Sequence, residues 1–81
     1  MKEFLKNARE MADKNYRENL TYVDSYLKSG VNEAASKGLH EATVKLQGYS
    51  SGVHLVRRCE ELGLKATFTM NGSWAICNVI F

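Results

Sequence analysis

The feature that most constrains this chain is an amphipathic stretch over residues 2–28. Placed on a helical wheel at about 100° per residue, its apolar residues occupy one side and its charged residues occupy the other. No glycine or proline interrupts the stretch. The pattern predicts one long amphipathic helix over residues 1–29. The apolar side consists of Phe4, Leu5, Ala8, Met11, Ala12, Tyr16, Leu20, Tyr22, Val23, Tyr26 and Leu27.

The predicted helix is longer than the rest of the chain is wide. It would measure about 39 Å, whereas the remaining residues would form a globule only about 25 Å across. Its apolar side must therefore fold back as a bent pair or be covered by another chain, and we expect a homo-oligomer. The tyrosines have two interpretations, core packing and an interface, where tyrosine buries area and keeps a polar tip. The predicted interface residues are Tyr16, Leu20, Tyr22, Val23, Tyr26, Leu27, Trp74 and Ile76.

The residues after this helix predict a module over residues 31–81. Ser29 and Gly30 indicate a break, followed by a short helix over residues 31–37. Residues 40–46 alternate as a half-buried strand, and residues 53–62 repeat apolar side chains at helical spacing. Asn71-Gly72 predicts a hairpin whose two-residue loop pairs Met70 with Ser73. We therefore expect one α+β domain over residues 1–81: a long N-terminal helix, a short helix and a β-α-β-β unit with a three-stranded mixed sheet.

The final strand is apolar on both faces, which favours a central position in the sheet. The two strands that flank the helix over residues 53–62 should be parallel and joined by a right-handed crossover. The expected strand order is therefore first, third, second. That helix would cover one face, and the long helix, from the same chain or a neighbour, would cover Trp74, Ile76 and Ile80 on the other.

Composition argues against several function classes. Eleven basic and nine acidic residues give a net charge of +2 without a basic run, which makes a nucleic-acid partner an unfavoured expectation. No stretch approaches 18 apolar residues and no signal peptide is recognisable, so we expect no membrane partner and a cytoplasmic location. Cys59 and Cys77 lack metal-ligand spacing, and their main interpretation is reduced core thiols, with a disulfide as the alternative.

One loop is a candidate ligand site. Residues 48–52 lead into a helix whose free N–H groups would attract an anion, beside two serine hydroxyls, a tyrosine ring and two guanidinium groups. The alternative is an ordinary turn in which Ser50 or Ser51 caps the helix and the arginines are solvated or paired with Glu61. We find no catalytic constellation, metal site or cofactor motif, and we predict no enzyme activity and no cofactor. The predicted ligand residues are Tyr49, Ser50, Ser51, Gly52, His54, Arg57 and Arg58.

The predicted core residues and helix ends between Val31 and Phe81 follow one pattern along the chain. They are Val31-x-x-Ala34-Ala35-x-x-Gly38, Ala42-x-Val44, Leu62-Gly63, Ala66-x-Phe68 and Trp74-x-Ile76. The pattern resembles a module of small bacteriophage-encoded accessory proteins. The resemblance implies a phage protein that works in the cytoplasm of an infected bacterium. We expect a non-enzymatic, homo-oligomeric binding protein that inhibits or sequesters a host factor, one of a defence system among the options. The alternatives are a sponge for a small anionic ligand such as a nucleotide and a minor structural virion protein.

Overall fold

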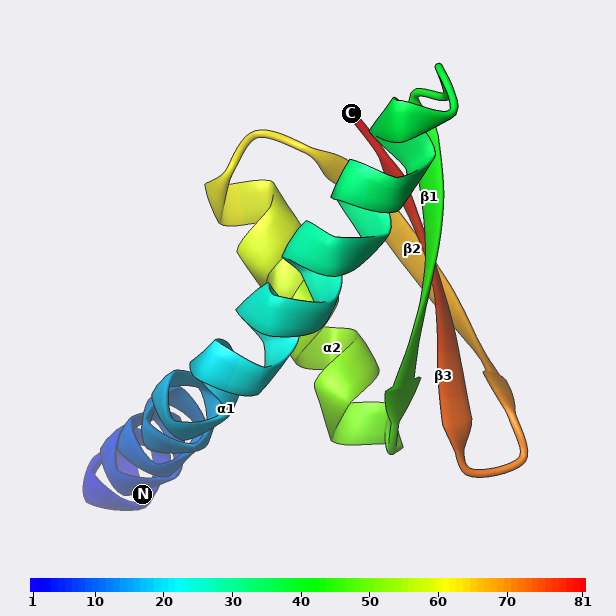
Figure 1. Cartoon of the computed structure of the whole chain (residues 1–81). Coiled ribbons are helices and arrows are strands. Elements are labelled where there is room, and N and C mark those ends of the chain that lie inside the picture. Colours follow the sequence, from blue (N-terminus) through cyan, green and yellow to red (C-terminus); the bar gives the residue numbers. More distant parts are fainter.

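Two helices pack on the same face of a three-stranded sheet in the computed structural model, which describes all 81 residues (Figure 1). The fold is α+β, as predicted. The first helix is much longer than the second, and the sheet follows the order of a split β-α-β unit. The elements are α1 (Lys2–Ser36), β1 (Glu41–Gln47), α2 (Tyr49–Glu61), β2 (Lys65–Asn71) and β3 (Trp74–Ile80).

The strand order is β1-β3-β2, which confirms the predicted order. Both outer strands pair with β3 in the antiparallel sense. The two outer strands are therefore parallel to each other, but β3 separates them, and the sheet has no parallel hydrogen-bonded pair. The sheet is therefore antiparallel, and the prediction of a mixed sheet is wrong.

The β2–β3 hairpin turns one residue later than the sequence predicts. Its loop is Gly72-Ser73, and Asn71 stays in the strand and pairs with Trp74. Gly72 has a φ of +63°, and a glycine with positive φ at the first loop position is the arrangement of a type II′ turn. The predicted partners are thus displaced by two residues. Because side chains alternate with a period of two, every side chain keeps its predicted face.

The core lies between the helices and the inner face of the sheet. Each strand places alternate side chains there, and α1 and α2 close the layer from above. Both cysteines are free and buried in this core, as their main interpretation predicts. Burial raises the pKa of Cys77 to about 11, with a smaller contribution from Cys59. The core residues are Val23, Leu27, Val44, Leu46, Leu55, Cys59, Ala75, Cys77 and Val79.

The predicted break at Ser29 and Gly30 is wrong, and so is the separate helix over residues 31–37. The α1 helix continues through both residues to Ser36. Gly30 serves a packing role there, since a Cβ atom on it would lie only 2.8 Å from Cγ2 of Val44. The missing side chain lets the last turns of α1 approach β1 closely. The helix ends that were predicted before Gly38 and Gly63 are confirmed.

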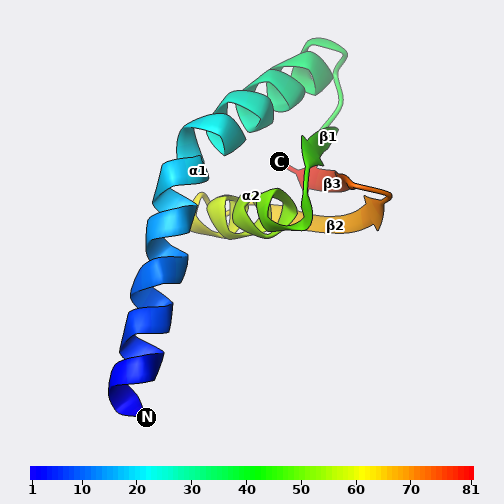
Figure 2. The same cartoon turned by 90° about the horizontal axis from the view of Figure 1, so that it is seen from below.

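The long helix is bent, and its N-terminal part leaves the body of the protein. Figure 2 shows the change of direction in the cyan part of α1. Residues 2–12, which we call the arm, are all exposed. The protein measures 50 × 28 × 18 Å with a radius of gyration of 13.9 Å, whereas a compact chain of this length would have about 12 Å. The overhang expected from the sequence is therefore present, and it lies at the N-terminal end.

The face of the sheet opposite the helices is uncovered. The expectation that α1 of the same chain covers Trp74, Ile76 and Ile80 is wrong, because both helices lie on the other face (Figure 1). Trp74 and Ile80 remain 48% and 53% exposed. We call this surface the bare face. Its residues are Glu41, Thr43, Lys45, Gln47, Lys65, Thr67, Thr69, Asn71, Trp74, Ile76, Asn78 and Ile80.

Candidate functional site

Half of the predicted helical interface residues are buried within their own chain. Tyr16, Val23 and Leu27 are buried, which makes their interface assignment wrong. These residues recur at heptad spacing with Ala34 on the side of α1 that faces β1 and α2. This half of the helix therefore has its partner within the monomer. Leu20 and Tyr22 are partly buried.

Three further predicted interface residues, like Leu20 and Tyr22, keep surface in the monomer. Tyr26 is half exposed, and its ring packs edge-to-face on Tyr22 with centroids 4.9 Å apart. Trp74 is half exposed and Ile76 is partly exposed on the bare face. Other exposed apolar side chains, including Phe4, Leu5 and Met11, were not among the predicted interface residues.

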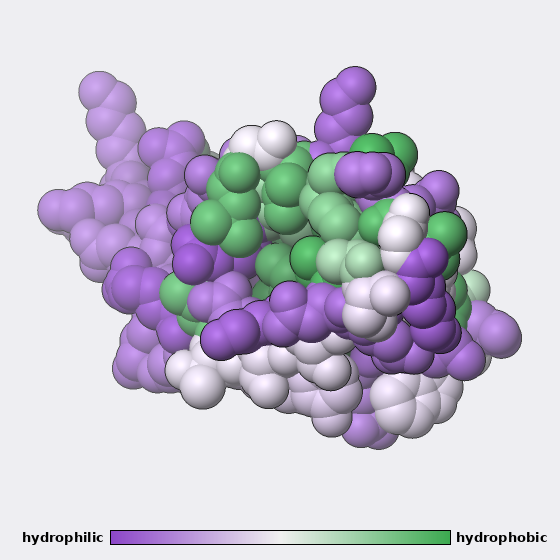
Figure 3. All heavy atoms as spheres, turned by 45° about the horizontal axis from the view of Figure 1, so that its top comes forward, coloured by the Kyte–Doolittle hydropathy of each residue, from purple (hydrophilic) through white to green (hydrophobic).

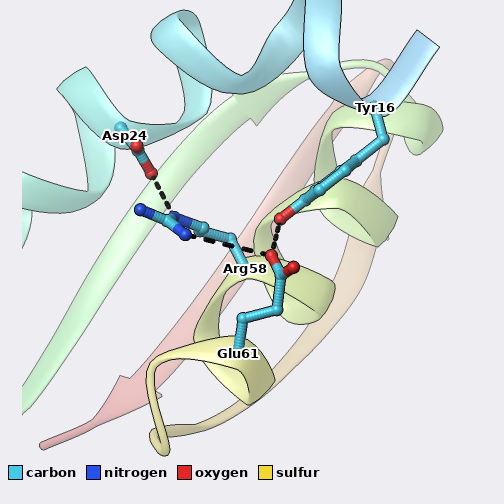
Figure 4. Close-up of polar contacts among 4 residues, drawn as sticks. All are labelled: Tyr16, Asp24, Arg58 and Glu61. Atoms are coloured by element: carbon cyan, nitrogen blue, oxygen red, sulfur yellow. Dashed lines mark hydrogen bonds and ion pairs between the residues drawn. The ribbon is translucent and has the colours of Figure 1, made fainter. Parts of the chain in front are cut away.

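Tyr16 joins α1 to α2 at the base of the arm. Its hydroxyl donates a hydrogen bond to the carboxylate of Glu61 (Figure 4). The Arg57 guanidinium lies 4.0 Å from the centre of the Tyr16 ring. The edge of the His54 ring meets the same tyrosine at 5.5 Å. Burial, and then the carboxylate of Glu61, raise the pKa of Tyr16 to about 12. These contacts tie the N-terminal half of α1 to α2.

Both arginines of the predicted ligand loop are engaged with α1. Nη1 of Arg57 lies 3.0 Å from Oδ1 of Asp13. Nε of Arg58 donates to Oδ1 of Asp24 at 2.9 Å, and its Nη1 lies 3.9 Å from Glu61 (Figure 4). The hydrogen bond to Asp24 is the main reason that the pKa of Arg58 is raised. The guanidinium groups hold the two helices together, and neither lines the loop's cleft.

A polar cleft of about 690 Å³ lies between α1 and the first turns of α2. Three of the predicted ligand residues line it: Ser50, Ser51 and His54. The side-chain nitrogen of Asn19 donates to Oγ of Ser51 at 3.4 Å and lies 3.1 Å from Nδ1 of His54. Its lining is completed by Ala12, Asn15, Glu18 and Asn19. The structure thus brings together part of the predicted site with residues of α1 that sequence reasoning missed.

The other loop residues point elsewhere. Tyr49 packs edge-to-face on Phe68 at 5.4 Å, and Gly52 is buried beneath that ring. The helix begins at Tyr49 after Gly48, with no side-chain cap, so the assignment of Ser50 or Ser51 as the cap is wrong. The backbone N–H of Gly48 donates to the carbonyl of Ser73 at 2.8 Å. This bond starts the helix one turn earlier than predicted.

The charges around the cleft do not favour an anion. Glu18 contributes a carboxylate to the lining, and no lysine or arginine lines it. Burial, and then the nearby charge of Arg57, lower the pKa of His54 below its ordinary value, which keeps the imidazole neutral near pH 7. An anion would meet hydroxyl and amide groups but no cation. The cleft therefore does not favour the anionic-ligand alternative.

The lowered pKa of His54 predicts a specific acid sensitivity. The unfolded chain binds the histidine proton more readily than the folded protein does, so the free energy of unfolding should fall as pH drops below about 6.5. We expect urea denaturation between pH 7 and pH 5 to show this loss in the native protein. His54→Gln should lack that part of the pH dependence. An identical pH profile for both proteins would contradict the burial of a neutral histidine.

The arm carries an apolar side that touches nothing in the monomer. Phe4, Leu5 and Met11 are 68%, 44% and 66% exposed. Ala8 lies between them on the same side of the helix, whereas Ala12, at the end of the arm, borders the cleft between α1 and α2. Monomeric proteins rarely leave large contiguous apolar patches in water, and such patches mark interaction sites.

A second apolar surface lies at the end of the molecule where α2 leads into β2. A groove of about 300 Å³ is lined there by Leu27, Val31, Leu62 and Leu64. Figure 3 views the protein from this end and shows apolar side chains gathered within a hydrophilic surround. Asp24, Lys28 and Arg58 complete the lining. The monomer thus offers three uncovered apolar surfaces: the arm, the bare face and this groove.

The structure contains no cluster of three or more side chains that could hold a metal ion. None of its helices is both long and apolar enough to cross a membrane.

Comparisons with known proteins identify no relative of this chain. No family model, no curated protein and no solved structure matches the chain. The resemblance to bacteriophage accessory modules therefore stays a prediction.

Proposed function

We propose that this protein is a non-enzymatic binding protein that associates with itself through its N-terminal arm and blocks or sequesters a host protein. One observation carries the self-association: the helix over residues 2–12 exposes an apolar side that has no partner in the monomer. The rest of α1 packs on its own body, so the arm is the part left for another molecule.

Helix energetics support this use of the arm. Packing of an apolar face supplies most of the stability of helices in proteins, and the packed half of α1 has such packing. The arm has no such packing in the monomer. A partner that covers Phe4, Leu5 and Met11 would supply it.

The host-protein part of the proposal rests on the resemblance to phage accessory modules and on the nature of the exposed surfaces. Those surfaces are apolar and rimmed by mixed charges, which suits contact with proteins. The cleft holds Ser50, Ser51 and His54, but Asn19 bonds two of them and no acidic partner is seen to bond His54. The arrangement supports binding better than chemistry.

The arm's role predicts a change in molecular mass. The double variant Phe4→Asp/Leu5→Asp should convert the protein to a 9.1 kDa monomer in light scattering coupled to size exclusion, because charged groups would replace the apolar contacts. Its thermal unfolding as a monomer should be unchanged, since neither side chain packs on the body. Lys6→Glu, on the polar side of the same helix, is the control and alters net charge equally.

Two results would contradict the proposal. A wild-type protein that sediments as a monomer at high micromolar concentration would remove self-association. The host-protein part needs its own measurement: capture from a bacterial lysate on the immobilised chain, followed by an assay of the captured protein's activity. A captured protein whose activity is unaffected and which remains free in solution would contradict blocking and sequestration.

A further inference from the structure

We infer that the bare face of the sheet is the surface on which the arm of a second copy docks, with the exchange made reciprocally. The inference rests on the proposed self-association and gives it a definite surface. Each subunit would then cover the sheet of the other. The result is a sheet with helices on both faces.

The bare face carries an apolar row along its central strand. Trp74, Ile76 and Ile80 stand on this face of β3, with Asn78 between the two isoleucines, and polar side chains flank them on both neighbouring strands. Asn78 accepts a hydrogen bond from Oγ1 of Thr43 at 3.3 Å. The pairing places Ile76 between Lys45 and Thr69. An apolar stripe with polar margins is the shape that an amphipathic helix matches.

The dimensions of the two surfaces agree. The arm over residues 2–12 is about 17 Å long at 1.5 Å per residue. The row from Trp74 to Ile80 spans about 20 Å at 3.3 Å per residue. A helix laid along the strand would therefore cover almost the whole row, because the two lengths differ by less than one helical turn.

Side-chain sizes on the two surfaces are complementary. The arm has alanine at position 8, in the middle of its apolar side, and a second alanine at its end, position 12. Large side chains stand on the sheet at Trp74, Ile76 and Ile80. Small residues on one surface and large ones on the other allow close packing without voids.

The area to be buried distinguishes this arrangement from a simple pairing of two arms. The apolar half of one arm offers roughly 300 Å². Two arms packed on each other would bury only about 600 Å² in total, which is in the range of crystal contacts. Reciprocal docking buries two arms and two sheet faces, about 1,200 Å² in total, which reaches the range of specific interfaces. The partner that satisfies both uncovered surfaces is therefore a second copy of the chain.

The groove beside Leu62 is a poorer seat for the arm. It is lined by four apolar residues, and Asp24, Lys28 and Arg58 share its lining. Two of those charged groups already pair with each other at 2.9 Å. The bare face offers a longer apolar row and has no such pair across its centre.

Trp74 is the only tryptophan in the chain and reports directly on the bare face. Its emission should shift to shorter wavelength as protein concentration rises, in step with the mass measured by sedimentation. The shift should be absent in Phe4→Asp/Leu5→Asp, which keeps Trp74. Emission that is independent of concentration in a protein that does dimerise would overturn the inference.

Variants of the bare face and of the groove distinguish docking on the bare face from self-association through some other surface. Ile76→Thr/Ile80→Thr keeps β-branched residues in the strand and should weaken dimerisation at least tenfold. Leu62→Asp, in the groove, should leave dimerisation unchanged. If the arm variant is monomeric but the threonine variant dimerises normally, or if Leu62→Asp dissociates the dimer, the bare face is not the seat although self-association stands. A wild-type monomer would remove both.

Mixing gives the sharpest test of reciprocal docking. The arm variant retains an intact bare face, and the threonine variant retains an intact arm. Each alone should be monomeric, but their mixture should form a heterodimer through one intact contact. Pairing of arm with arm predicts no such rescue, because every mixed pair would contain a defective arm. Because the heterodimer keeps one of two contacts, about 600 Å², it should form only at concentrations well above those at which wild type dimerises. A mixture that associates no more than either variant alone at the highest soluble concentration would contradict the inference.

Discussion

Replacing Gly52 by alanine should destabilise the protein although the substitution raises helix propensity. Gly52 lies inside α2 and is buried. A Cβ atom on it would lie 2.6 Å from two ring atoms of Phe68 and 3.0 Å from Cβ of Ala75. Overpacking of this kind typically costs about 1–3 kcal/mol, and the helix gain of about 1 kcal/mol offsets only part of it. Two ring contacts this close place the cost in the upper part of that range, so we expect a net loss of about 1–2 kcal/mol for alanine and more for valine.

The measurement is urea denaturation of Gly52→Ala beside two comparison variants. Ser50→Ala changes an exposed residue of the same helix and should be nearly neutral. Gly52→Ala combined with Phe68→Leu should recover part of the loss, because the shorter side chain removes the ring edge that the new methyl group meets. A Gly52→Ala protein as stable as wild type would show that α2 does not lie this close to the sheet.

Replacing Tyr16 by alanine should cause the largest loss of stability among single changes on α1. The tyrosine is 4% exposed and joins the two helices through its ring and its hydroxyl. Truncation of a buried aromatic residue costs about 3–5 kcal/mol. It would also leave Glu61 without its donor and Arg57 without the ring beneath it. We expect a loss of about 3 kcal/mol or more in urea denaturation.

The contributions of the hydroxyl and of the ring of Tyr16 to the free energy of unfolding can be distinguished by varying the pH. Because the folded state raises the pKa of this tyrosine from 10.0 to about 12, the folded protein holds the phenol proton more tightly than the unfolded chain. The resulting stability is present below pH 10 and is lost as pH rises toward 12, by up to about 2 kcal/mol. Tyr16→Phe keeps the ring and should lack this alkaline loss. An equal alkaline loss in both proteins would contradict the buried bond to Glu61.

Local patterns in the chain were sufficient for the architecture of the sheet. Strict alternation assigned the inner face to Ala42, Val44 and Leu46, and all three are buried. The two-sided apolar character of β3 placed it in the centre. The hairpin was predicted correctly, but its turn begins one residue later than predicted. The reason is that Gly72 has a positive φ, whereas Asn71 does not.

The candidate site was predicted less well, for a physical reason. The loop around Ser50 and Ser51 was predicted to bind an anion, and the structure shows that its serines border a cleft. The pairing of Arg57 with Asp13 joins residues far apart in sequence. No local pattern indicates such a pair. The exposed arm did leave a signal. On the helical wheel its apolar residues are centred about a quarter turn away from those of the buried half, so one helix has two apolar directions.

The order of amino acids therefore decided which elements form and which side of each one is apolar, because these properties depend on residues only a few positions apart. Long-range packing decided what lies against those sides. It carried α1 through Gly30 because that residue fits against Val44, it placed both helices on one face of the sheet, and it left the arm and the row at Trp74, Ile76 and Ile80 without cover. Several distant segments could cover the same apolar surface, and only the folded structure shows which of them does.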